Sequence, residues 1–108
     1  MYVHTTILKV SPENVPVAME ILFGEKIQAF YKTLTGFQHG YLIEAVEEPG
    51  KLVSLSHWDS MADAQKTMSD PAYAGLMGDL RKLLIAAPER YGYSLLREVG
   101  KEAFQPAG

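Results

Sequence analysis

The chain has 108 residues, of which 47% are hydrophobic and 21% are charged, and its formal net charge is −3. This length fits one domain with a single modest core, and this composition excludes a disordered, collagen-like or repeat protein. Ten basic residues against thirteen acidic ones provide no basic surface for phosphate groups. We therefore expect neither nucleic acid nor an anionic membrane surface as a partner.

Cysteine is absent from the sequence, which excludes disulfides, thiolate nucleophiles and zinc sites that use sulfur ligands. The first residues lack the basic start, apolar centre and small-residue cleavage site of a signal peptide. No apolar run approaches the roughly 20 residues that are needed to span a bilayer. We expect a cytoplasmic protein with a single domain over residues 1–100 and a C-terminal tail over residues 101–108.

The first third of the chain predicts a strand and a helix. Residues 2–10 are rich in Val, Thr, Ile and Tyr, a composition typical of a strand. Ser11 and the proline after it form a helix-start signal, with Ser11 as the N-cap. Apolar side chains then recur every three or four residues as far as Leu34, which predicts one long helix with Gly36 as its C-cap. Gly24 weakens the middle of this helix and allows a bend there.

A hairpin follows, because residues 37–47 and 51–58 have strand composition and flank a turn that contains proline and glycine. A three-residue loop would place Tyr41 opposite His57, whereas a two-residue loop would place Tyr41 opposite Trp58. Both registers stay open. Since His57 and Trp58 are neighbours in one strand, we expect their side chains to point to opposite faces of the sheet.

The last third predicts a second, interrupted helix and a final strand. Ser60 and Asp63 resemble a capping box that begins the helix, and the segment Ser69-Asp70-Pro71 interrupts it before residues 72–87 continue. Residues 90–99 have strand composition. The resulting order predicts an α+β fold in which two helices cover one face of a four-stranded antiparallel sheet. Large apolar side chains on both faces of the hairpin predict a homodimer that forms by sheet-on-sheet packing.

Three segments carry a family resemblance: Leu34 to Leu42, His57-Trp58-Asp59-Ser60, and Asp70-Pro71-Ala72-Tyr73. Together with the element order over residues 2–99, they resemble the antibiotic biosynthesis monooxygenase-like family. The resemblance implies a ferredoxin-like βαββαβ protomer, a dimeric α+β barrel, and a pocket between the sheet and the helices of each protomer. The family includes cofactor-independent oxygenases of polycyclic phenols and quinols.

Haem-degrading enzymes also belong to this family, and they use an Asn, a Trp and a His as a triad. Alignment on the segment around Trp58 places this triad at Thr5, Thr67 and Met77. Since all three residue types differ, the resemblance does not imply haem degradation of that kind.

The candidate bases for the implied pocket are His57 and His39, because histidine titrates near neutral pH. We expect five residues to contact the substrate: Trp58, Tyr73, Met77, Thr5 and Tyr41. Trp58 lies where the family's oxygenases often place an aromatic side chain, and the hydroxyl of Tyr73 can hydrogen-bond a phenol or quinone oxygen. We expect His4, near the N-terminus, to have a structural role.

The sequence predicts neither a metal nor a bound cofactor. Three histidines without a local acidic cluster lack the spacing of a metal site, and Gly75 and Gly78 match no phosphate-binding fingerprint. The favoured function is a cofactor-independent monooxygenase-like protein that acts on a small aromatic or quinol-type molecule. Two alternatives stay open: a non-catalytic small-ligand-binding or stress-associated barrel, and an isomerase of the same superfold that requires no oxygen.

Overall fold

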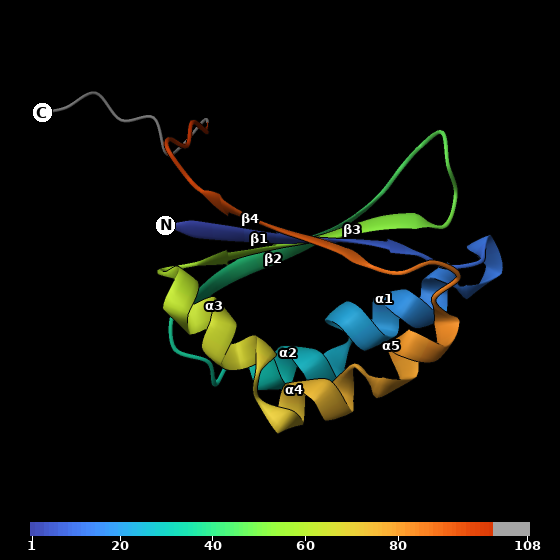
Figure 1. The fold of residues 1–108 in the computed structure, drawn as a ribbon, viewed down its shortest axis with the longest axis horizontal. Coiled ribbons are helices and arrows are strands. Elements are labelled where there is room, and N and C mark those ends of the chain that lie inside the picture. Colours follow the sequence, from blue (N-terminus) through green and yellow to red (C-terminus); the bar gives the residue numbers. More distant parts are fainter. Residues whose placement is uncertain (101–108) are drawn as a thin grey trace, which may run out of the picture.

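The computed structural model describes residues 1–100 and shows a four-stranded sheet with helices on one face (Figure 1). Its strands follow the order β2-β3-β1-β4, and every neighbouring pair is antiparallel. Their bounds are β1 Tyr2–Lys9, β2 Phe37–Glu44, β3 Lys51–Trp58 and β4 Glu89–Ser94. The predicted α+β class and βαββαβ order are confirmed. The predicted tail over residues 101–108 lies outside the described residues.

The first helical segment is shorter and more divided than the prediction of one long helix. It comprises the 3₁₀ turn η1 (Pro12–Asn14), α1 (Val15–Phe23) and α2 (Glu25–Tyr31). Gly24 separates α1 from α2 because its backbone is extended, with φ −73° and ψ −179°. Ser11 occupies the predicted N-cap position, before η1, but its side chain makes no cap bond. The predicted C-cap is wrong: the C-cap of α2 is Lys32, and Gly36 lies beyond it, in the turn before β2, with φ +83°.

The second helical segment is divided twice, into α3 (Met61–Met68), α4 (Pro71–Leu76) and α5 (Gly78–Leu83). The predicted start is confirmed, because the Ser60 hydroxyl accepts a hydrogen bond from the Asp63 backbone N–H at 3.2 Å. The predicted interruption is also confirmed, since the Asp70 carboxylate accepts one from the Ala72 N–H at 2.9 Å. The second break, at Met77, was not predicted. In Figure 1 the three helices follow one another beneath the sheet.

The register of the hairpin differs from both predicted registers, because Tyr41 lies opposite Leu55. The connection is longer than expected, since the Ala45 N–H already donates to the carbonyl of Lys51 at 3.0 Å. Gly50 has φ +93°, which favours glycine, and its N–H donates to the Glu44 carboxylate at 3.0 Å. The pairing of β2 with β3 is therefore shifted by two residues from the pairing that the three-residue loop predicts.

The two faces of the sheet have different surroundings. The helix-covered face holds the main core, made of Leu8, Val10, Ala18, Leu22, Ile27, Leu52, Met77 and Leu80. The opposite face carries no helix within residues 1–100 (Figure 1), and we call it the open face. The strand pairings place these side chains on it: Val3, Thr5, Ile7, His39, Tyr41, Ile43, Val53, Leu55, His57, Tyr91 and Tyr93. One chain alone thus leaves a broad apolar and aromatic surface uncovered by the described residues, as predicted.

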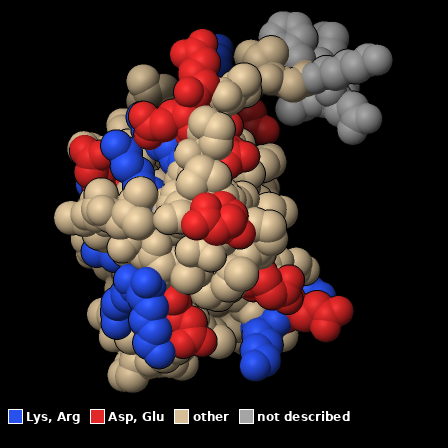
Figure 2. Space-filling model, turned by 90° about the vertical axis from the view of Figure 1, so that its right-hand side faces the viewer, with Lys and Arg blue, Asp and Glu red and all other residues tan. Residues whose placement is uncertain are grey.

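The rest of the surface carries charges of both signs. Figure 2 shows Lys and Arg side chains next to Asp and Glu side chains on one side of the molecule. Two ion pairs join Lys9 to Glu48, with 3.7 Å between Nζ and Oε2, and Lys82 to Asp79, with 3.5 Å between Nζ and Oδ1. In the described part of the chain, no helix has the length and apolar character that crossing a membrane requires.

Candidate functional site

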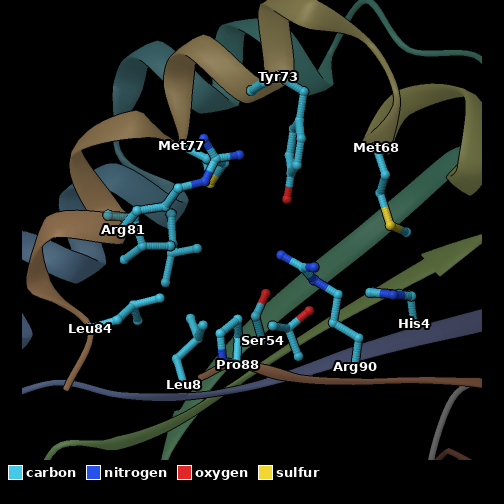
Figure 3. A pocket seen from close by; sticks show the side chains of 14 residues that line it. His4, Leu8, Ser54, Met68, Tyr73, Met77, Arg81, Leu84, Pro88 and Arg90 are labelled. Carbon is cyan, nitrogen blue, oxygen red and sulfur yellow. The ribbon is translucent and has the colours of Figure 1, made fainter. Parts of the chain in front are cut away.

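A cavity of about 400 Å³ lies between the sheet and the helices (Figure 3). Most of its wall is apolar and comes from Leu8 on β1, Met68 on α3, and leucine and methionine side chains around α5. Its polar lining consists of His4, Thr6, Ser54, Tyr73, Arg81 and Arg90. Ligand sites typically have volumes of about 300–1,000 Å³ and a few polar groups in a mainly apolar wall. The cavity therefore has the size and composition of a site for a small organic molecule.

Strand alternation selects the residues that the sheet contributes. Leu8 is buried in the core, so the residues two and four positions before it in β1, Thr6 and His4, lie on the same helix-covered face. On β4, Arg90 reaches this face because it pairs with Thr6. Thr5 lies between these two residues in the chain, but its side chain points to the open face of the sheet. The sheet thus contributes one imidazole, one guanidinium and two small hydroxyl groups to the cavity.

Tyr73 lies on α4, whose start is fixed by the Asp70 cap and by Pro71. Figure 3 shows its hydroxyl pointing into the cavity, toward Arg90. Burial raises the pKa of Tyr73, while the positive charges of Arg90 and Arg81 act in the opposite direction. The phenol is therefore protonated at neutral pH and able to donate a hydrogen bond to a ligand oxygen.

His4 is half-buried at the opposite wall of the cavity (Figure 3). Burial lowers the pKa of its imidazole, and the positive charge of Arg90 lowers it further. The ring is therefore mainly neutral at pH 7, the form that accepts a proton. His4 and Tyr73 together give the cavity one proton acceptor and one hydrogen-bond donor.

Three of the predicted substrate contacts lie on the helix-covered side of the sheet. Tyr73 and Met77 line the cavity. Trp58 does not line it, because its side chain is only 2% exposed and packs edge-on against Phe37, with 5.2 Å between the ring centroids. The Trp58 Nε1–H donates to the Ser56 hydroxyl at 2.9 Å. In this chain Trp58 is therefore a core residue that packs against Phe37.

The other four predicted site residues lie on the open face. His39 and His57 are cross-strand partners with ring centroids 4.4 Å apart, and the ring of Tyr41 contacts both. Thr5 lies on the same face, on β1. The predicted opposite orientation of His57 and Trp58 is confirmed. Neither candidate base lines the cavity, so the assignment of His39 or His57 as the base has no support from their positions.

Sequence reasoning missed five of the six polar residues of the cavity: His4, Thr6, Ser54, Arg81 and Arg90. The signal for His4 was present, because alternation from the apolar Leu8 places it on the core side of β1. The signal for the arginines was weak. Arg81 follows an unpredicted break in the helix. Arg90 lies in β4, whose pairing with β1 was not predicted.

No family model matches the chain, and no curated protein matches it. Among solved structures, the monooxygenase from the gene ActVA-Orf6 of Streptomyces coelicolor, solved with nanaomycin D, has a TM-score of 0.78 at 20% identity. The match covers 91% of this chain and 89% of that chain. SnoaB, a cofactor-independent oxygenase from Streptomyces nogalater that was solved as a mutant, has a TM-score of 0.73 at 14% identity, covering 93% and 97% of the two chains.

A protein from Deinococcus radiodurans that is assigned to the antibiotic biosynthesis monooxygenases has a TM-score of 0.76 at 17% identity. That match covers 93% of this chain and 97% of the other. At these identities the similarity concerns the fold. The chain has the ferredoxin-like α+β fold of the antibiotic biosynthesis monooxygenase-like proteins, as the sequence resemblance predicts.

Proposed function

We propose that this protein is a cofactor-independent monooxygenase and that its substrate is a small aromatic or quinol-type molecule bound in the cavity. The observation that carries the proposal is a mainly apolar cavity of about 400 Å³ that brings a neutral imidazole and a phenol to the same space. One similar structure belongs to a cofactor-independent oxygenase. Fold similarity alone does not fix a reaction, so the proposal depends on the chemistry of the cavity.

In this reaction the substrate supplies the electrons. A base removes the phenolic proton, the phenolate transfers one electron to O₂, and the resulting radical pair combines to form a carbon–oxygen bond. The base returns its proton to the peroxide that this bond creates. Loss of the hydrogen on the same carbon as a proton then breaks the O–O bond, so that one oxygen atom stays in the product as a quinone carbonyl and the other leaves as water, and no external reductant is required. The apolar wall shields the radical pair from water during these steps.

The described residues suit these steps. His4 is the candidate base, because it is the histidine that lines the cavity and its lowered pKa keeps it neutral. Tyr73 donates a hydrogen bond to the substrate oxygen from the opposite wall. Met77 and Leu80, both buried, hold the aromatic ring by apolar contact.

We further propose that the protein acts as a homodimer joined through the open face. The exposed aromatic and aliphatic side chains of this face support the proposal, since soluble monomers rarely expose apolar patches above a few hundred Å². Packing the open faces of two copies together would leave both cavities free on the helix-covered sides. The predicted cytoplasmic location depends on the sequence alone.

The test is oxygen consumption by the purified, chelator-treated protein with a panel of quinols and polycyclic phenols. Protein-dependent uptake with a matching yield of quinone supports the proposal. Saturable binding without uptake would contradict it and favour the non-catalytic barrel. Conversion of a panel compound in the absence of oxygen would favour the isomerase.

A further inference from the structure

Two arginines reach the cavity from opposite walls. Arg81 comes from α5 and Arg90 comes from β4, and Figure 3 shows both side chains extending toward Tyr73. Both side chains are also exposed, which places them where the cavity meets solvent. Among residues 1–100, those that line the cavity include no Asp or Glu. The open end of the cavity therefore carries two positive charges and no negative charge from the described residues that line it.

Neither guanidinium has a carboxylate partner in the part of the chain that the structure describes. The ion pairs there belong to Lys9 and Lys82, with Nζ to carboxylate distances of 3.7 and 3.5 Å. The contrast with Lys82 is direct, because it follows Arg81 in the same helix and pairs with Asp79. Two like charges beside an apolar wall repel each other unless an anion lies between them.

The charges of both arginines act on the polar atoms inside the cavity. Arg90 and Arg81 each oppose the rise in the pKa of Tyr73, and Arg90 also lowers the pKa of His4. The two guanidinium groups and the Tyr73 hydroxyl therefore face a common space, in agreement with their positions in Figure 3. An anionic group of a ligand in that space would meet donors from both walls.

We propose that the cavity selects an amphiphilic anion, with an aromatic body and a carboxylate. The carboxylate accepts hydrogen bonds from Arg81 and Arg90 at the open end, and the aromatic body lies against Met77 and Leu80 inside. A guanidinium suits this role because its planar array of donors matches the two oxygens of a carboxylate. The inference depends on the proposed function, in which this cavity is the ligand site, and it narrows the substrate to acidic aromatic molecules.

Isothermal titration calorimetry with naphthoate and naphthamide tests this inference, because the two probes have the same ring system and differ in charge. We expect naphthoate to bind roughly ten times more tightly or better, since a hydrogen bond to a charged group contributes about 1.5–3 kcal/mol. We also expect the advantage to shrink at high ionic strength, because the arginines are exposed. Equal affinities for the two probes, or no binding of naphthoate, would overturn the inference.

Substitutions identify the groups responsible. We expect Arg81→Gln and Arg90→Gln each to weaken naphthoate binding about tenfold and to weaken naphthamide binding much less, because the neutral amide does not carry the charge that the guanidinium binds. Lys82→Gln is the matched control, because it removes a positive charge next to Arg81 that lies outside the cavity lining. An equal loss with Lys82→Gln would show a general charge effect and overturn the assignment. Naphthamide binding reports in each variant whether the cavity is still folded.

The two proposals fail in different ways. Preferential naphthoate binding without oxygen uptake from any quinol would reject the monooxygenase and retain the anion site. Oxygen uptake that is as fast with neutral quinols as with their carboxylated analogues would retain the monooxygenase and reject the anion site. The comparison uses the same protein preparation for both assays.

Discussion

His4 and Thr5 are neighbours in β1, yet His4 lines the cavity and Thr5 lies on the open face. In a strand, a shift of one residue moves a side chain to the other side of the sheet. The alignment that assigned Thr5 to the pocket was one residue away from a cavity position. For His57 and Trp58, the opposite orientation could be predicted from the sequence, because the two residues are neighbours in one strand and the prediction requires no alignment with other proteins.

His4→Gln tests the base at the residue scale. We expect this substitution to lower the rate of oxygen uptake by about a hundredfold or more, since a positioned general base contributes about 10²–10⁴-fold. His39→Gln is the matched control, because His39 lies on the open face. An oxygen electrode measures both variants. A His4→Gln variant with the wild-type rate would exclude His4 as the base.

At the scale of elements, the N-caps of the second helical segment were predictable, whereas the caps of the first segment were not. Ser60 and Asp70 cap helices where the sequence predicts helix starts, because short polar side chains satisfy free N–H groups at such ends. The break at Met77 was unpredictable, since methionine and the glycine that follows it carry no distinct stop signal. The length of the hairpin loop was missed for a similar reason. The Glu44 carboxylate that binds the Gly50 N–H is a contact that spacing does not reveal.

Asp70→Ala tests the cap that begins α4. We expect the free energy of unfolding to fall by about 1 kcal/mol, the usual cost of losing an N-cap side chain. Urea denaturation measures this value. Asp70→Ser is the control, because serine also caps helices and is expected to retain most of the stability. Equal losses in the two variants would mean that the bond to the Ala72 N–H contributes little.

At the scale of the whole molecule, the fold and the open apolar face could be predicted from the sequence, whereas the residues that line the cavity could be predicted only in part. The element order depends on local patterns of strand and helix residues, which one sequence displays. The cavity depends on which side chains of β1, α4, α5 and β4 meet across space. Tyr73 and Met77 were among the predicted contacts because the resemblance covers the second helical segment, whereas Arg81 and Arg90 meet only in the folded chain.

Ile43→Glu tests the proposed dimer. The Ile43 side chain lies on the open face and is 53% exposed in one chain. We expect the dimer Kd to rise by about tenfold or more, because dimerisation would bury a carboxylate without a partner. Val46→Glu is the control, since Val46 is 96% exposed and lies in the connection after β2. Sedimentation velocity measures both variants, and equal Kd values would contradict dimerisation through this face.

The His39 and His57 pair predicts that stability depends on pH. Burial lowers the pKa of His57 below 6.5, and the neighbouring His39 lowers it further, while Glu98 opposes the shift. Tyr41 is the other titratable group whose ring contacts His57. The unfolded chain therefore takes up a proton first as the pH falls below about 6.5, and the folded state loses stability there.

We expect the free energy of unfolding of the wild type to fall between about pH 7.5 and pH 5.5 by more than that of His57→Gln. Other groups titrate equally in both proteins. The difference between the two losses of unfolding free energy therefore gives the contribution of His57. Urea titrations at the two pH values measure it. A larger loss in His57→Gln than in the wild type would contradict the lowered pKa.

The measurement that tests the central claim most directly is histidine NMR during titration with a hydroxynaphthoquinone as a product analogue. The sequence has three histidines, of which His4 lines the cavity and the other two lie on the open face. If the cavity is the ligand site, the ring signals of His4 shift with saturation while those of His39 and His57 stay in place. Shifts confined to His39 and His57 would place the ligand on the open face and contradict the account.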